Sequence, residues 1–284
     1  EMVEPQDVAR ECRILQTLNP VFPLAPKPYV LCEDLSIIGA PFYVMERRQG
    51  IVIRSEEPPQ ICDQPRQRER VSGAMVDVLA DLHTIDVFQH GLVSLGKPEG
   101  FVERQVRGWT QRWHSSKTTE QREMNYLSEW LLKRLPPEPL RPALLHGDYK
   151  LDNVMLDAID PGRVVAVLDW EMSAVGDPLI DLGILLAYWV HTGTVASSNS
   201  LISVTVRPGW FTREQIIERY AQRTGIDVAN IQFYEVFAVF KLAVVLQQIF
   251  FRYHRGQTDD ARFASLDKGV DSLAHIAVQL AEGA

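Results

Sequence analysis

The hydrophobic positions along the chain predict mainly helices, with a few short strands. Apolar residues recur at helical spacing in residues 5–18 and 66–85. Further segments of helical character are residues 101–114, 120–135, 179–190, 212–225, 230–253 and 259–282. Turn-forming residues mark several of their ends, as at Pro20, Pro136, Gly225 and Gly256. The pattern therefore predicts that the second part of the chain is largely helical.

Short apolar runs between these segments predict strands. Two of them, residues 29–31 and 41–45, lie near the start of the chain, and residues 143–145 and 154–156 lie near its middle. Residues 164–168 are rich in valine and are bounded by Pro161-Gly162 and Asp169, which is typical of a buried strand after a tight turn. Residues 193–203 are rich in serine and predict a loop.

Polar side chains follow these central strands. Asp148 and Asn153 lie between residues 143–145 and 154–156, and Asp169 comes directly after the valine-rich run. Polar residues at the ends of neighbouring strands can converge in space. The spacing gives one candidate base and two oxygen ligands that suit a hard cation such as magnesium, which takes its remaining ligands from phosphate and water. The spacing thus indicates a site for magnesium and nucleotide phosphates.

Three linked motifs carry a family resemblance. They are H-G-D-Y-K-L-D-N at residues 146–153, D-W-E at residues 169–171 and G-D-P-L-I-D-L at residues 176–182. Together they resemble the catalytic and metal-binding loops of the protein-kinase-like superfamily. Gly147 and the D-W-E variant are similar to the aminoglycoside phosphotransferase and choline kinase branch. Residues 8–251 are similar in particular to the kinase-like domains found alone in bacteria and fused to acyl-CoA dehydrogenases in animals.

The resemblance implies an α+β, protein-kinase-like fold. Residues 1–47 would form a small N-terminal β lobe that looks incomplete and leads to the hinge. Residues 48–284 would form a large helical C-terminal lobe that carries the catalytic and acceptor-binding residues.

The resemblance also implies roles for the residues of the central loops. Asp148 would be the base or orienting group for an acceptor hydroxyl, and Lys150 would stabilise charge on the transferred phosphoryl group. Asn153 and Asp169 would hold magnesium on the phosphates of ATP. The residues implied as structural supports of the loop backbone are His146 and Asp181. The alternative for each of the aspartates is an ordinary turn or cap residue.

The N-terminal residues depart from the family pattern. Glu11 would pair with the ATP-binding lysine of the small lobe, or else be an exposed helical charge. The hinge would be Met45, Glu46 and Arg47, whose backbone groups would meet adenine. No lysine precedes Lys27, however. Either the sequence lacks the first strands of the lobe, which its start without methionine favours, or the protein has lost them and is catalytically impaired.

Composition narrows the remaining possibilities. A formal charge of −8 argues against broad binding to nucleic acid or anionic membranes. The apolar runs, residues 182–190 and 236–246, are shorter than the roughly 20 residues that a membrane span needs. The three cysteines show no C-x-x-C spacing and favour a reducing, cytoplasmic location. The oligomeric state is left open.

These observations predict an ATP- and magnesium-dependent phosphotransferase acting on a hydroxyl of a small molecule. Residues 201–257 hold seven basic and four acidic residues, which favours a neutral or anionic acceptor over a polycationic one. With the resemblance, a hydroxyacyl thioester of coenzyme A is the leading acceptor hypothesis. A non-catalytic, kinase-like binding module is the alternative, since it would explain the missing lysine. A metal hydrolase is disfavoured by the lack of an H-E-x-x-H or comparable ligand spacing.

Overall fold

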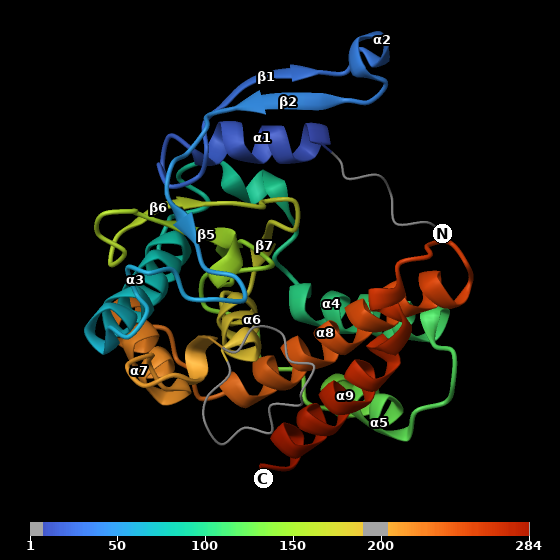
Figure 1. Ribbon diagram of the computed structural model, residues 1–284. Coiled ribbons are helices and arrows are strands. Elements are labelled where there is room, and N and C mark those ends of the chain that lie inside the picture. Colours follow the sequence, from blue (N-terminus) through green and yellow to red (C-terminus); the bar gives the residue numbers. More distant parts are fainter. Residues whose placement is uncertain (1–7, 190–203, 284) are drawn as a thin grey trace.

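The N-terminal part of the chain consists of one helix and a hairpin. The computed structural model describes residues 8–189 and 204–283, so the predicted loop at residues 193–203 lies outside the described residues. Helix α1 (Val8–Leu18) is followed by the antiparallel strands β1 (Pro28–Cys32) and β2 (Phe42–Met45). Figure 1 shows this hairpin at the top of the molecule with α1 beneath it. The predicted helix and both predicted strands are confirmed.

A short helix that the sequence pattern did not predict, α2 (Leu35–Ile38), forms the tip of the hairpin. Its N-cap, Asp34, accepts a hydrogen bond from the backbone N–H of Ser36, and Gly39 ends it with a left-handed φ of 83°. One turn of helix is too short to show a 3.6-residue period. The turn chemistry of Asp34 and Gly39 was its only signal.

The central strands form two small antiparallel sheets. In one sheet the order is β3 (Ile51–Val52), β5 (Val154–Leu156) and β6 (Val164–Val167). In the other, β4 (Ala143–Leu145) pairs with β7 (Ala174–Gly176). The predicted strands β4, β5 and β6 are confirmed, whereas β3 and β7, of two and three residues, were not predicted.

Helices make up most of the rest of the chain. The helices are α3 (Pro65–His83), α4 (Phe101–Ser116), α5 (Arg122–Lys133), α6 (Leu179–Tyr188), α7 (Arg213–Thr224), α8 (Ile231–His254) and α9 (Leu266–Glu282). Short 3-10 helices are η1 (Leu92–Leu95), η2 (Leu151–Asn153), η3 (Val204–Val206) and η4 (Ala261–Ser265). The α-helices match the predicted helical segments, whereas the 3-10 helices η1, η2 and η3 were not predicted. The protein thus has an α+β, protein-kinase-like fold with a small β-containing N-terminal part and a large helical part.

Helix α8 is the central helix of this large part. Figure 1 shows it between α6, α4 and α9. The helix that contains the apolar run of residues 236–246 is 24 residues long, so by length and composition alone it could cross a membrane. The expectation that all apolar segments are too short is therefore wrong for α8. However, 67% of its most apolar window is buried inside the protein, as in the core helix of a globular domain.

Helix α1 shares the core of the large helical part. Its Leu15 and Leu18 belong to the same cluster of buried side chains as residues of α3, α6 and α8. Phe22, just beyond α1, packs edge to face on Trp170 with ring centroids 5.9 Å apart. Burial of these apolar surfaces binds α1 to the loop that follows β6. The division of the chain at residue 47 stays a prediction.

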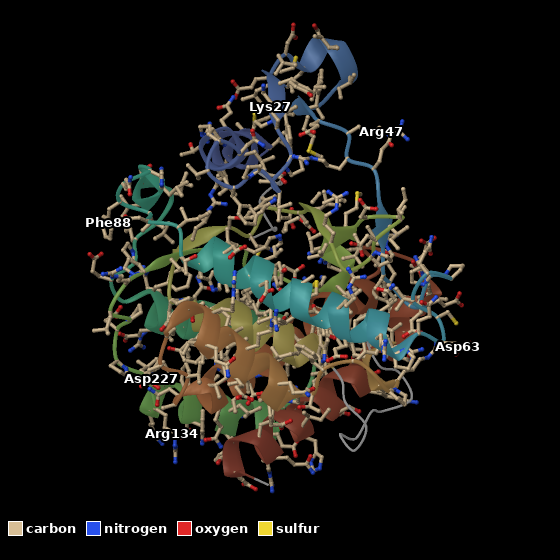
Figure 2. The ribbon with its side chains drawn as sticks, turned by 90° about the vertical axis from the view of Figure 1, so that its left-hand side faces the viewer. Lys27, Arg47, Asp63, Phe88, Arg134 and Asp227 are labelled. Atoms are coloured by element: carbon tan, nitrogen blue, oxygen red, sulfur yellow. The ribbon has the colours of Figure 1, made fainter. Side chains whose placement is uncertain are left out.

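A matched pair of phenylalanine substitutions tests this view of the core. Phe240 of α8 is completely buried, whereas Phe88 is 63% exposed and lies at the edge of the molecule (Figure 2). We expect Phe240→Ala to lower the free energy of unfolding by about 3–5 kcal/mol. Phe88→Ala should change it by less than about 0.5 kcal/mol. Urea unfolding monitored by circular dichroism measures both, and equal effects would contradict this assignment of the core.

Candidate active site

The central loop begins where the buried strand β4 ends, and a single carboxylate holds its backbone. Asp181, in the first turn of α6, accepts hydrogen bonds from the N–H groups of His146 and Gly147 at 2.6 and 2.8 Å. It also lies 3.3 Å from Nε2 of His83 on α3. Asp181 and His146 are both completely buried. The two residues predicted as structural supports therefore lie together beneath the loop.

Burial and hydrogen bonding decide the charges of this pair. Burial by itself would raise the pKa of Asp181, but the hydrogen bond and charge of His83, together with His146, hold that pKa below its ordinary value. Burial lowers the pKa of His146. Its Nε2 lies 2.8 Å from the carbonyl oxygen of Leu168, and its Nδ1 accepts from the Asp148 N–H at 3.2 Å. These contacts fit a neutral imidazole with its proton on Nε2.

Gly147 allows the loop to make its turn. Its φ is 83°, in the left-handed region that glycine adopts without strain. A Cβ atom at this position would lie 2.5 Å from the backbone oxygen of Met172. Only glycine fits between the loop and the segment that follows Asp169.

Asp148 and Asn153 are joined directly. The Asn153 side-chain nitrogen donates to the backbone oxygen of Asp148 at 2.9 Å and to its carboxylate at 3.2 Å. Lys150 donates to the same carboxylate at 2.7 Å, and its ammonium lies 4.9 Å from the ring centre of Tyr188. Burial would lower the pKa of Lys150, but Tyr188 and Asp148 outweigh it and raise that pKa. Lys150 is therefore a cation directly beside the candidate base.

Asp169 reaches the same place through the β5–β6 hairpin. Val154 pairs with Val167, and the backbone N–H of Leu168 donates to the backbone oxygen of Asn153 at 2.8 Å. The hairpin thus places Asn153 opposite the residue that precedes Asp169. Asp169 has a φ of 68°, which is uncommon for a residue other than glycine and is found mostly in turns and at functional sites. Asp148 and Asp169 both act electrostatically on His146.

The donor atoms fit a magnesium ion. Both hydrogen bonds of Asn153 to Asp148 use its side-chain nitrogen, which leaves the side-chain oxygen for another partner. The Asp169 side chain is exposed. Magnesium in nucleotide sites is held by one or two protein oxygens, with phosphate and water as the other ligands. Within residues 8–189 and 204–283, no three His, Cys, Asp or Glu side chains group into a fuller metal site.

Helix α1 contacts the loop that contains Asp169 through two adjacent side chains. Arg10 donates to the backbone oxygens of Glu171 and Ser173 at 2.9 and 2.5 Å. Glu11 accepts hydrogen bonds from the Tyr43 hydroxyl and the Trp170 N–H, and burial raises its pKa. Glu11 is thus not simply an exposed helical charge. Its contacts are with Tyr43 and Trp170, and its predicted pairing with a lysine stays a prediction.

The three predicted hinge residues lie at and after the end of β2. The Glu46 N–H donates to the Lys27 oxygen at 2.8 Å, which continues the pairing of β1 with β2. The Glu46 carboxylate forms an ion pair with Arg48 at 3.0 Å. Met45 is 43% exposed. Arg47 is exposed on the segment that connects the hairpin to the large helical part (Figure 2). The backbone N–H of Glu46 is therefore already engaged within the hairpin.

The sequence reasoning assigned no role to Lys241, which contacts the loop directly. Lys241 of α8 donates from Nζ to the backbone oxygen of Gly147 at 2.7 Å. With Gly147 it lines a cavity of about 60 Å³ together with Phe101, Gln105, Met172 and Phe237, among others. A single charge within the apolar run of residues 236–246 was a signal available in the sequence.

The basic residues counted in positions 201–257 do not gather around one acceptor-binding surface. Four of the seven form ion pairs elsewhere, and these are Arg207, Arg213, Arg219 and Arg223. Arg252 and Arg255 are exposed at the end of α8. Lys241 is the member of the set that contacts the central loop. A sum of charges along the chain cannot tell which face of a helix each charge occupies.

A comparison with known families identifies the class of protein. Residues 3–225 match the phosphotransferase enzyme family, APH, and the chain belongs to that family. A solved structure from Ralstonia eutropha JMP134, provisionally named an aminoglycoside phosphotransferase, is 31% identical with a TM-score of 0.85. The match covers 98% of this chain and 84% of that one. Family and fold together support a small-molecule phosphotransferase.

Two further comparisons bear on the size and fold of the relatives. Acyl-CoA dehydrogenase family member 11 of Rattus norvegicus is 35% identical over 276 residues, which are 96% of this chain and 35% of the relative. The chain thus spans about a third of that relative's length. The GDP complex of aminoglycoside 2'-phosphotransferase-IIIa has a TM-score of 0.62 at 13% identity and covers 97% of this chain and 84% of that one. It shows the common fold alone.

Substitution of Asp181 tests the support beneath the loop. Asp181→Asn replaces one of the two acceptor oxygens by an N–H donor, so we expect a loss of about 1–3 kcal/mol in the free energy of unfolding at pH 7. Because the folded-state pKa of Asp181 is lowered, its charge stabilises the protein above the unfolded pKa, and this contribution disappears as the pH falls through the folded pKa. The difference from wild type should therefore shrink in acid.

Urea unfolding across a series of pH values measures this difference. The control is Asp259→Asn, the same change at an exposed position, for which no comparable loss is expected. A difference for Asp181→Asn that grows as the pH falls would contradict the assignment.

Proposed function

We propose that this protein is an ATP- and magnesium-dependent phosphotransferase that phosphorylates a hydroxyl group of a small molecule. The observation that carries the proposal is the single hydrogen-bonded frame that joins Asp148, Asn153 and the residue before Asp169. One candidate base and two oxygen donors lie on neighbouring loops of this frame. Phosphoryl transfer depends mainly on positioning and on neutralisation of charge, so it suits such a site.

Each residue of the frame has a role in this proposal. Asp148 orients the acceptor hydroxyl and accepts its proton. Its carboxylate is partly exposed, so an acceptor can reach it. Asn153 and Asp169 would hold magnesium, which when bound neutralises charge on the nucleotide phosphates. His146 and Asp181 hold the loop backbone in place for this chemistry.

Lys150 is proposed to contact both Asp148 and the transferred phosphoryl group. It forms an ion pair with Asp148 at 2.7 Å, with 17% of its side chain exposed. In the proposal the flexible ammonium shares its donors between Asp148 and the transferred phosphoryl group, since a lysine has three. This arrangement places a positive charge beside the developing negative charge of the reaction.

The nucleotide is proposed to lie on the side of α1 and the hairpin. Glu11 reaches this side through the Trp170 N–H, next to Asp169. Met45, Glu46 and Arg47 connect the hairpin to the large part, and the available backbone groups of this segment are proposed to meet adenine. The division into residues 1–47 and 48–284 belongs to the same proposal.

The acceptor is proposed to be neutral or anionic. Lys241 and Lys150 are the cations beside Asp148, and they would repel a cationic hydroxyl compound. The names of the acyl-CoA dehydrogenase family relatives support a hydroxyacyl thioester of coenzyme A as the first acceptor to test. A cytoplasmic location, with no nucleic-acid or membrane partner, completes the proposal, and the three free cysteines agree with it.

A non-catalytic binding module is the second candidate. The observation that favours it is that the hydrogen bonds of Glu11 go to Tyr43 and Trp170 and not to a lysine. This candidate predicts that the full-length protein shows no magnesium-dependent binding of ATP.

Loss of the candidate base gives the direct test of catalysis. We expect Asp148→Asn in the full-length protein to lower kcat by about 10²–10⁴-fold while the protein still folds. Magnesium-ATP turnover with each of a set of hydroxyl acceptors measures this, and Asp259→Asn serves as the matched control at an exposed site. Turnover by Asp148→Asn at the wild-type rate would disprove the role of Asp148.

Ligand binding can be tested without an acceptor. Because a ligand that binds the native state raises its melting temperature, magnesium-ATP should stabilise the full-length protein. Asp169→Asn should remove the part of the shift that depends on magnesium and leave the unliganded melting temperature nearly unchanged, since the side chain is exposed. A wild-type protein with no shift in melting temperature would favour the binding-module alternative.

A further inference from the structure

Lys241 is a charged residue within an apolar stretch of the long helix α8. It lies within residues 236–246 of α8, where its neighbours in sequence are apolar. Its ammonium lies 2.7 Å from the Gly147 oxygen and 5.4 Å from the ring centre of Trp109. A cation in such surroundings is unfavourable unless it is well partnered, and a methionine of similar length would avoid that cost. Stability of the helix core therefore does not explain the lysine.

The bond to Gly147 completes the support of one short stretch of backbone. The N–H groups of His146 and Gly147 point to the Asp181 carboxylate, whereas the C=O group of Gly147 points to Lys241. This glycine is thus held by an anion on one side and a cation on the other. Both bonds are charge-assisted and stronger than bonds between neutral groups. The next residue along the chain is Asp148.

Four charged groups act on Lys241 from the surrounding elements. Asp148 and Asp181 favour its charge, whereas Lys150 and Arg112 oppose it. Burial lowers the pKa of Lys241, and the two carboxylates counteract this. The cation is thus electrostatically coupled to the candidate base as well as hydrogen-bonded to the peptide before it.

On the basis of the function proposed above, we propose that Lys241 is a positioning residue for phosphoryl transfer. It holds the peptide between Gly147 and Asp148 in the orientation that directs the Asp148 carboxylate to the acceptor hydroxyl. Asp181 fixes only the N–H side of this stretch. Without Lys241, only the 3.2 Å hydrogen bond from the Asp148 N–H to Nδ1 of His146 would hold this peptide. The peptide could then rotate more easily and carry Asp148 with it, because glycine has little backbone preference of its own.

Kinetics with two substitutions test the effect on catalysis. Hydrolysis of magnesium-ATP by water is the activity probe, since it needs no identified acceptor. We expect Lys241→Met to lower kcat by about tenfold or more with the KM for ATP nearly unchanged, as for a group that acts in the transition state. The melting temperature should change little, because methionine leaves the Gly147 oxygen unpaired but also removes a buried charge. Lys241→Arg, which can still donate to the Gly147 oxygen, should recover most of the activity, and Lys268→Met is the exposed control.

Hydrogen exchange gives a readout that is independent of activity. The amides of Gly147 and Asp148 should exchange at least about tenfold faster in Lys241→Met, while those of α6 stay protected, because local opening is confined to the loop. If the wild-type protein hydrolyses no ATP, the proposed function fails, and the exchange result alone decides the role of Lys241. Unchanged exchange, an unchanged kcat in an active enzyme, or a lowered melting temperature without rescue by Lys241→Arg would each overturn the inference.

Discussion

The candidate site depends on one buried carboxylate, that of Asp181. It accepts hydrogen bonds from the N–H groups of His146 and Gly147 and contacts Nε2 of His83 on α3. The other ring nitrogen of His83 lies 2.7 Å from the Tyr220 hydroxyl on α7. The loop, α3, α6 and α7 thus meet at a single negative charge. Such a charge is tolerated inside a protein only when its hydrogen-bonding capacity is filled, so the groups around it have little freedom to move.

The second constraint is the pairing of two loops through the β5–β6 hairpin. Backbone hydrogen bonds place Asn153 opposite Leu168, and the Leu168 oxygen in turn lies 2.8 Å from His146. The loop that carries Asp148 and the loop that carries Asp169 are therefore parts of one network. Helix α1 binds the second loop through Arg10 and Glu11. Movement of α1 relative to the large helical part would consequently move the residues around Asp169.

Much of the fold could be predicted from the chain alone, because long amphipathic helices repeat their pattern over several turns. Helices α1 and α3 to α9 were predicted from apolar residues at helical spacing or in continuous runs, and β1, β2, β4, β5 and β6 from short apolar runs. The elements that were missed, α2, β3 and β7, are two to four residues long and show no period. Within the candidate site, Asp148, Asn153 and Asp169 were predicted from residue type, spacing and the family resemblance, and their roles stay predictions. Lys241 was missed because 94 residues separate it from Gly147.

The sequence by itself determined the oxygen donors of the site, the glycine that its turn requires and the apolar faces that build the core. Only the tertiary structure decided which charges meet. It turned Lys241 toward the loop, paired Arg207, Arg213, Arg219 and Arg223 with carboxylates elsewhere, and gave Glu11 the Tyr43 and Trp170 partners. The physical reason is that the local pattern of residues shows which face of a helix is buried. A hydrogen bond between distant residues depends instead on how whole helices pack.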